Sequence, residues 1–584
     1  MDLLKILRNL APNVNWIIEE ERNEFFIQVL DLCGYRKDHY YFSSIFHQQE
    51  VDFLLIQAAI TNYYEGLEFI QFLARTGYKD RIDVPKDGNN PLLLRRTTAV
   101  HHAARYKPYD WECMVEDLFK IFDRFDVNYV DALGLTHFHV ACMACMCGDV
   151  VRKFLERGRV DPNLVWPETG DSPLHLSVRH GGNESVKILL RNGADPNLAN
   201  EDGFTPLHTS AKLIWNHGTK LTFDALFCED RKHPLRLDAR DNLGDTPLHL
   251  ALKHRHMEVA EVLLREGASP NLPNDEGHTP LHIICQSDDR YTLLFVDRGE
   301  AETFLKVTEE LNQPVQVDAR DKLGRTPLQL AVANLRPHAV ESLLDRGADL
   351  SSFVLLPEED FTTRFDPNKD DLSYFKLGII SSGALAVFES LEKRGYKVED
   401  YVLIIMKIFS RLGLFQSSVS FKTHWYDDKK FATEAKRIQI LPRISRGDYN
   451  DFSEFERAKI ETAMTPSLSF YDLIRLRPEE AAKILTYRDY YDLERSIELP
   501  WLPGIYYEDV ILYLYEKVMR GFCRRWALKY FYDLIRYRLS ILCCEKIIDQ
   551  LTNEDLCNIC FAATDQDQYS FSFLQPSVVT MKVD

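Results

Sequence analysis

The chain has 584 residues, of which 45% are hydrophobic and 27% charged, an ordinary globular balance in a length that exceeds one hydrophobic core. The formal net charge of -19 argues against broad contact with a nucleic-acid backbone or an anionic membrane, because both require basic surface. We find neither a secretory leader nor an apolar run of about 18 residues, so we expect an intracellular protein of the cytoplasm or nucleus, without nucleic-acid or membrane partners.

Residues 1–50 are expected to form an N-terminal helical cap, and one pattern then recurs through residues 51–352 with a period of about 33 residues. Its clearest copy runs from Asp241 to Asn274 as DNLGDTPLHLALKHRHMEVAEVLLREGASPNLPN. Other copies begin at Thr97, Asp131, Glu168, Glu201, Asp275 and Asp321, with a fainter one from Leu54. We expect about seven to eight units, two of them carrying insertions, within residues 213–237 and 288–316.

Each position of the repeat has a physical purpose. Gly244 lies in a turn, where a positive φ costs glycine little, and Thr246 can cap the first helix. Pro247 suits the first helical position, because the N–H it lacks would have no partner there. Each unit leaves apolar faces open at both ends, so the units must stack into a solenoid.

The pattern resembles ankyrin repeats, and the resemblance implies that His249 hydrogen-bonds turn backbone. Because such histidines recur with the repeat and do not converge on one place, we interpret them as structural, not as catalytic or metal-binding. The structural motif comprises Thr205, Pro206, His208, Thr246, Pro247, His249, Thr279, Pro280 and His282.

The resemblance further implies that a target protein binds to the turn tips and first helices. Tip residues that vary between units are the natural specificity surface of a rigid frame. Our candidates for target binding are Leu135, Phe204, Asp245, His278 and Arg325.

After the array, residues 353–464 are expected to form a degenerate, ankyrin-like helical linker that closes the stack. Residues 465–562 are rich in aromatic side chains at helical spacing, which favours a helical module with an aromatic core over a base-stacking platform. Residues 563–584 are expected to be a polar tail. The fold class is therefore all-α, an ankyrin-repeat solenoid followed by a helical module.

The end of that module, LSILCCEKIIDQLTNEDLCNIC from Leu539, predicts a short amphipathic helix and then a second helix capped by Thr552 or Asn553. The run resembles a truncated F-box core, although Ser540 stands where that family has proline and Leu542 where it often has glutamate. The positions that match, and therefore our candidates for adaptor binding, are Leu539, Ile547, Leu551, Asp555 and Leu556.

Ankyrin repeats followed by such a box resemble the PRANC architecture, the pox-protein repeats of ankyrin at the C-terminus. That resemblance implies a non-catalytic adaptor, in which the box binds a Skp-type subunit of a cullin ubiquitin ligase and the array selects the substrate. It also implies an effect on innate immune signalling such as the NF-κB pathway. The alternative is an ankyrin scaffold or inhibitor that masks a partner, with the C-terminal module only capping the stack.

We find no phosphate-binding loop, dinucleotide fingerprint or nucleophile elbow, so no catalysis and no cofactor is expected. A third interpretation is a zinc site at Cys543, Cys544, Cys557 and Cys560, or within CMACMC at Cys142, Cys145 and Cys147. We favour buried apolar thiols instead, because these cysteines lie in predicted helices without the tight turns of zinc knuckles.

Overall fold

The computed structural model describes most of the repeat array and much of the C-terminal module. The described residues are 21, 24–29, 46–60, 64–81, 92–157, 160–213, 217–228, 232–286, 299–357, 374–412, 414, 428–440, 468–476, 478–481, 483–494 and 504–564. Most of the predicted N-terminal cap, parts of both insertions, much of the linker and nearly all of the polar tail lie outside them.

The chain divides into two compact units. The first comprises residues 1–280 and 311–313, and the second comprises residues 281–310 and 314–584. The boundary falls inside the range that the sequence assigns to the repeats.

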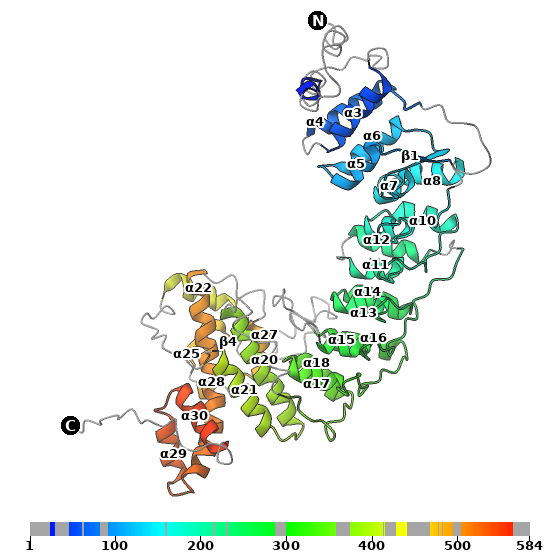
Figure 1. The fold of residues 1–584 in the computed structure, drawn as a ribbon. Coiled ribbons are helices and arrows are strands. Elements are labelled where there is room, and N and C mark those ends of the chain that lie inside the picture. The colour runs from blue at the N-terminus through cyan, green and yellow to red at the C-terminus, as the bar shows by residue number, and fades with distance from the viewer. Residues whose placement is uncertain are drawn as a thin grey trace, which may run out of the picture. The chain divides into compact units, whose positions relative to one another are not determined.

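Helix pairs recur in chain order within each unit, and Figure 1 shows their helices by label. The first helices of the pairs are α3 (Gln48–Ile60), α5 (Ala99–Tyr106), α7 (His137–Met143), α9 (Pro173–Arg179), α11 (Pro206–Lys212), α13 (Pro247–Lys253), α15 (Pro280–Gln286) and α17 (Pro327–Ala333). The second helices are α4 (Tyr64–Arg75), α6 (Trp111–Ile121), α8 (Gly148–Arg157), α10 (Asn183–Arg191), α12 (His217–Leu226), α14 (Met257–Arg265), α16 (Glu300–Glu310) and α18 (Pro337–Asp345).

The start of each first helix follows from its sequence. In α13, the side chain of Thr246 accepts the His249 amide while Pro247 occupies the first helical position, and Ser172, Thr205 and Thr326 cap their helices in the same way. Gly244 has φ 74, and a Cβ on it would collide with the carboxylate of Asp275 in the next turn. A glycine is therefore required there both for conformation and for the close approach of neighbouring turns.

The fold is mostly helical, but the strictly all-α prediction is wrong in detail. Strand β1 (Leu92–Arg95) pairs in parallel with β2 (Val127–Val130), and β3 (Gln439–Ile440) pairs antiparallel with β4 (Leu468–Ser469). These short extended runs satisfy backbone N–H and C=O groups by pairing with each other. The sequence patterns of these runs are too short to show an alternating strand signal.

In the second unit, a long helix organises the C-terminal module. Helix α20 (Tyr374–Lys393) packs against α18, α27 and α28, and the helices of this part are α20, α21 (Glu399–Arg411), α22 (Lys429–Arg437), α25 (Phe470–Arg475), α26 (Pro478–Ala481), α27 (Tyr487–Glu494), α28 (Gly504–Leu534), α29 (Ile541–Ile548) and α30 (Asn553–Thr564). Phe388 of α20 meets Phe522 of α28 edge to face, with ring centroids 5.3 Å apart. Gly383 lets α20 approach closely, because a Cβ there would lie 3.1 Å from the ring of Tyr491 in α27. Aromatic side chains therefore form the core of this module.

Among the helices that the structure describes, none has both the length and the apolar composition that crossing a bilayer would require.

Candidate interaction surfaces

The turn before each first helix is closed by one Asp or Asn side chain. Asp241 Oδ1 accepts the backbone N–H groups of Leu243 and Asp245, both at 2.8 Å. Asp131, Asn200, Asn274 and Asp321 do the same in their own turns. Two backbone amides per turn are satisfied in this way, so the side chain fixes the conformation of the turn.

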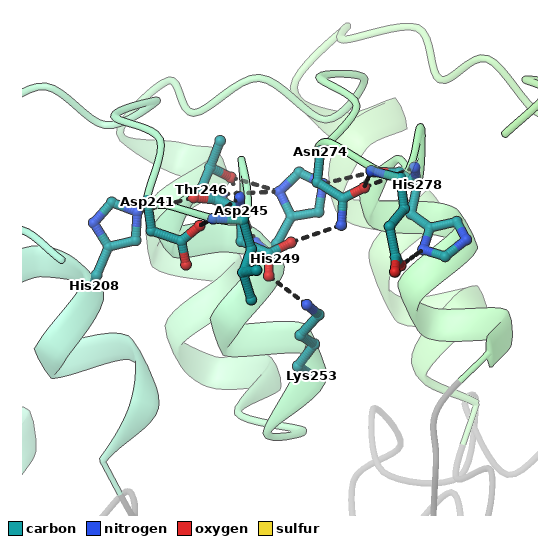
Figure 2. A network of polar contacts seen from close by, with 10 residues as sticks. His208, Asp241, Asp245, Thr246, His249, Lys253, Asn274 and His278 are labelled. Atoms are coloured by element: carbon teal, nitrogen blue, oxygen red, sulfur yellow. Dashed lines mark hydrogen bonds and ion pairs between the residues drawn. The ribbon is translucent and has the colours of Figure 1, made fainter. Parts of the chain in front are cut away.

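His249 joins its own helix to the next turn, as Figure 2 shows. The Thr246 N–H donates to Nδ1 at 3.2 Å, so the neutral ring carries its proton on Nε2, which donates to the carbonyl oxygen of His278 at 3.0 Å. The same bond runs from His175 to Phe204, from His208 to Asp245 and from His282 to Arg325.

Burial lowers the pKa of His249 to about 4, although the bond to the His278 carbonyl acts in the opposite direction. His139 and His175 behave alike, each with its pKa lowered by burial to about 4. These rings are therefore neutral near pH 7, and both nitrogens of His249 are occupied by structural bonds. Such a ring has no lone pair left for a metal ion or for a substrate.

The predicted target-binding positions are less accessible to solvent than a turn tip would be. Leu135, Asp245 and His278 are buried, and Phe204 and Arg325 are half-buried. Their carbonyl oxygens face the stack, because those of Phe204, Asp245, His278 and Arg325 accept the histidine bonds described above. The side chain of Asp245 is likewise engaged, by Asn274 Nδ2 at 2.8 Å and by Lys253 (Figure 2).

The exposed tip lies two residues earlier in each turn. Leu133, Leu243 and Leu323 occupy equivalent positions and are 55%, 66% and 75% exposed. The sequence did contain a signal for these leucines, since all three occur in the motif Asp-x-Leu-Gly. Sequence reasoning missed them because a leucine in a repeat is ordinarily assigned to the core.

Helix α29 presents apolar side chains to solvent at the end of the module. Leu539, Ile541, Leu542 and Ile547 are between 40% and 66% exposed, whereas only Cys544 and Ile548 of this helix are buried. We call these four exposed side chains, three of α29 and Leu539 just before its cap, the α29 face. The sequence identified Leu539 and Ile547 as candidates, but Ile541 and Leu542 were not among them.

The other three predicted adaptor-binding residues have different surroundings. Asp555 accepts the N–H of Thr552 at 2.9 Å, and Thr552 Oγ1 accepts the N–H of Asp555 at 3.2 Å, so Thr552 is the cap of α30. Leu556 is fully buried, and Leu551 is half-buried. A partner at the α29 face would therefore not contact Leu556 directly.

Two arginines of α28 hold the turn between α29 and α30. Arg520 donates to the carbonyl oxygens of Ile548 at 3.3 Å, of Asp549 at 3.1 Å and of Leu551. Arg524 Nε donates to Asp549 Oδ1 at 2.7 Å. A cation at a helix C-terminus satisfies carbonyls that have no intrahelical partner, so these arginines fix the C-terminal end of α29.

Three of the four tail cysteines fit the prediction of buried apolar thiols, whereas Cys543 is exposed. Cys544, Cys557 and Cys560 are buried, and burial raises the pKa of the Cys560 thiol to about 12, so this thiol is protonated near pH 7. Within the described ranges, no group of three or more His, Cys, Asp or Glu side chains is arranged to hold a metal ion. The zinc interpretation therefore has no ligand set in that part of the chain.

Comparison with known proteins identifies the repeats. Residues 100–200, 138–232, 174–274, 213–300 and 266–353 match the family described as ankyrin repeats in three copies. Together these matches span residues 100–353, somewhat less than half of the chain.

Three relatives illustrate how broadly this similarity extends. Human transient receptor potential cation channel subfamily A member 1 is 30% identical over 261 residues, which are 42% of this chain and 21% of that protein. Human rabankyrin-5 is 30% identical over 187 residues, which are 32% of this chain and 14% of that protein. The putative ankyrin repeat protein FPV222 of fowlpox virus is 31% identical over 146 residues, which are 24% of this chain and 17% of that protein. The matches span only about a fifth or less of each relative.

Among solved structures, the ankyrin repeat domain of Bcl-3 aligns with 37% of this chain and 87% of its own, at 22% identity and a TM-score of 0.31. This likeness is too weak to decide anything about the arrangement of the repeats. The sequence matches, the capped helix pairs and the histidine bonds between successive turns agree with one another. Residues 100–353 of this chain are therefore an array of ankyrin repeats, a fold that in general binds other proteins.

Proposed function

We propose that the chain is a substrate-recognition adaptor, in which the array holds a target protein and the α29 face docks on a Skp-type subunit of a cullin ubiquitin ligase. The observation that carries the proposal is the exposure of Ile541, Leu542 and Ile547 on one short helix and of Leu539 directly before it. Had these side chains been covered by α28 or α30, nothing would have remained for an adaptor to contact.

The α29 face has the properties of a helix that a partner binds in a groove. Burying one leucine or isoleucine side chain completely is worth about 1.5–3 kcal/mol, so four partly exposed ones offer a useful driving force. The helix is also held in place by Arg520 and Arg524 before a partner arrives, which lowers the entropy lost on binding.

Such an adaptor needs no catalytic group of its own. It acts by raising the local concentration of its target near a recruited enzyme. Ankyrin-repeat proteins are in general non-catalytic scaffolds, which agrees with this role. A cytoplasmic or nuclear location, and an effect on innate immune signalling through the NF-κB pathway, belong to the same proposal.

A binding measurement with a purified Skp-type subunit tests the proposal. We expect the full chain to bind it, and Leu542→Asp to weaken binding by at least about tenfold, because a carboxylate would be buried at the interface. Leu323→Asp is the matched control, since Leu323 is a comparably exposed leucine on a repeat turn. Absence of binding by the unmodified chain, or equal affinity of Leu542→Asp, would refute the ligase role.

A specific observation also supports the second candidate, a scaffold or inhibitor that masks its partner. The C-terminal module packs on the last repeat helix, where Arg488 of α27 pairs with Glu341 at 3.3 Å and His338 with Asp492 at 3.0 Å. Covering the apolar end face of the solenoid would by itself explain why the chain has such a module.

Affinity purification from cells separates the two candidates. A chain that ends at residue 538 lacks α29 and α30 but retains the repeats. Under the adaptor proposal, this chain keeps the target and loses the ligase subunit. If both chains recover the same partners, the scaffold interpretation is the correct one.

A further inference from the structure

The turn that joins α28 to α29 ends the long helix in a defined way. The backbone N–H of Tyr537 donates to the carbonyl oxygen of Tyr532 at 3.1 Å. The backbone N–H of Arg536 donates to the carbonyl oxygen of Asp533 at 2.9 Å. These two bonds make a Schellman motif, in which the residue that follows the helix is left-handed and is usually glycine. The turn thereby satisfies carbonyl groups at the end of α28 that have no intrahelical partner.

Two residues of this turn carry side chains where the backbone favours glycine. Arg536 and Tyr537 have φ 53 and 59. This region is strained for every residue that has a Cβ, and it is uncommon for residues other than glycine. Strained backbone of this kind is found most often at functional sites, where the surrounding structure holds it in place. The strain makes these two side chains candidates for a function that glycine could not provide.

Tyr537 is held in place although most of its side chain faces solvent. Its ring meets the ring of Tyr532 edge to face, with centroids 4.7 Å apart, and its hydroxyl donates to Asp533. A contact between these two positions commonly accompanies the Schellman motif. The side chain of Tyr537 nevertheless remains 62% exposed. An aromatic ring that is already fixed loses little conformational entropy when a partner covers it.

Tyr537 adjoins the α29 face along the chain. It lies two residues before Leu539, so the Cα atoms of these two residues are at most about 7.6 Å apart. Leu539 is itself exposed, and the next residue, Ser540, caps α29 by accepting the Cys543 amide. The exposed helix therefore begins directly after the turn. A partner that covers Leu539 comes within reach of the Tyr537 ring.

The ring and the helix are both positioned before any partner binds. The bonds of the turn hold Tyr537 at the end of α28. Arg520 and Arg524, which also belong to α28, hold the far end of α29. Because one helix carries all of these supports, the ring and the α29 face are presented together. Preorganisation of this kind lowers the cost of binding.

We infer that Tyr537 is an anchor residue of the docking surface, and that the Skp-type subunit bound to the α29 face also covers this ring with an apolar pocket. Rigid aromatic side chains carry a large share of the binding energy in protein interfaces, and tyrosine is enriched among such residues. The inference rests on the proposed ligase role. It adds to that role a residue that determines how tightly the subunit is held.

Titration of a purified Skp-type subunit against variants of the full chain tests the anchor. Tyr537→Ala removes the ring, whereas Tyr537→Phe keeps the ring and loses only the bond to Asp533. Tyr106→Ala is the matched control, because Tyr106 is 63% exposed at the end of a repeat helix and also packs on one neighbouring ring, that of His102. Leu542→Asp is measured in the same series.

We expect Tyr537→Ala to weaken binding by about tenfold or more, because the apolar pocket of the subunit loses its occupant. Tyr537→Phe and Tyr106→Ala should bind within about twofold of the unmodified chain. Native-state hydrogen exchange of the Cys544 and Asp549 amides, which bond to carbonyls near the two ends of α29, should be the same in Tyr537→Ala and in the unmodified chain.

Each other outcome has a distinct meaning. Unchanged affinity of Tyr537→Ala overturns the anchor, and a loss for Leu542→Asp in the same series leaves the ligase role standing. Weaker binding of Tyr537→Ala together with faster exchange throughout α29 also overturns the anchor, because the tyrosine would then act only by positioning the helix. Absence of binding by the unmodified chain refutes the ligase role and the anchor together.

Discussion

Replacing Arg520 should loosen α29 without unfolding the module. The arginine donates to three carbonyl oxygens at the end of α29 and in the following turn, those of Ile548, Asp549 and Leu551. Apart from this clamp, the helix is attached through few buried side chains, principally Cys544 and Ile548. Arg520→Met keeps the length and apolar stem of the side chain and removes only the donors.

The expected magnitude follows from the number of bonds. A hydrogen bond to a charged group contributes about 1.5–3 kcal/mol, and partial exposure of the guanidinium reduces the sum, so we expect a loss of about 2–3 kcal/mol. Since 1.4 kcal/mol is a factor of ten, local opening of α29 should become about 30- to 150-fold more frequent.

Native-state hydrogen exchange measures this opening directly. The Asp549 and Gln550 amides, bonded to Glu545 and Ile547 carbonyls, report on the end of α29, and amides within α28 report on the module. Arg520→Lys should give an intermediate loss, and Arg437→Met, on the surface of α22, should give none. Unchanged protection of α29, or a parallel loss throughout α28, would contradict the clamp.

The remaining predictions concern the repeats. His249→Leu should lower the free energy of unfolding by about 2–4 kcal/mol, because it leaves buried polar groups unpaired, whereas His249→Gln should cost less than about 1 kcal/mol. Gln329 already fills the equivalent place in α17, accepting from Thr326 at 2.9 Å, so urea midpoints that fall equally for both variants would contradict this role. As pH falls from 6.5 toward 4, the unfolded chain binds protons that the buried histidines resist, so stability should decline with acid by at most about 1.4 kcal/mol per pH unit and histidine. His249→Gln should make this decline shallower, and a curve that stays flat from pH 7 to 4 would exclude the mechanism. Asp241→Ala should cost about 1–2 kcal/mol because it frees two turn amides, whereas Asp275→Ala, which loses an exposed pair with Arg240, should cost less than about 1 kcal/mol. Thermal unfolding compares these two variants, and equal losses would show that the turn bonds contribute nothing.

The local chemistry of the repeats could be read from the sequence because it is set by residues close together in the chain. Thr246 caps its helix, Pro247 occupies the first helical position, where no N–H is needed, and Gly244 adopts the positive φ of the turn. The period of the pattern fixed the helix pairs for the same reason. The buried histidines were also recognisable as structural, since they recurred at that period.

What each turn shows to solvent was decided only by the stacking of repeats. Asp245 and His278 looked like tips in the sequence, but their carbonyl oxygens accept bonds from histidines 37 and 29 residues earlier. The exposed leucines at 243 and 323 were not among the sequence candidates, and only the neighbouring repeat determines whether such a side chain is buried.

Contacts between side chains far apart in the chain depend on tertiary structure for the same reason. Trp111 meets His180 across an intervening repeat, and no short-range pattern relates these two rings. In α29, the hydrophobic spacing showed an amphipathic helix, but only the packing of α28 behind it determined that Leu542 stays outside while Ile548 is buried. Sequence periodicity fixes which side chains share a face of a helix, and the packed neighbours determine whether that face remains free to bind.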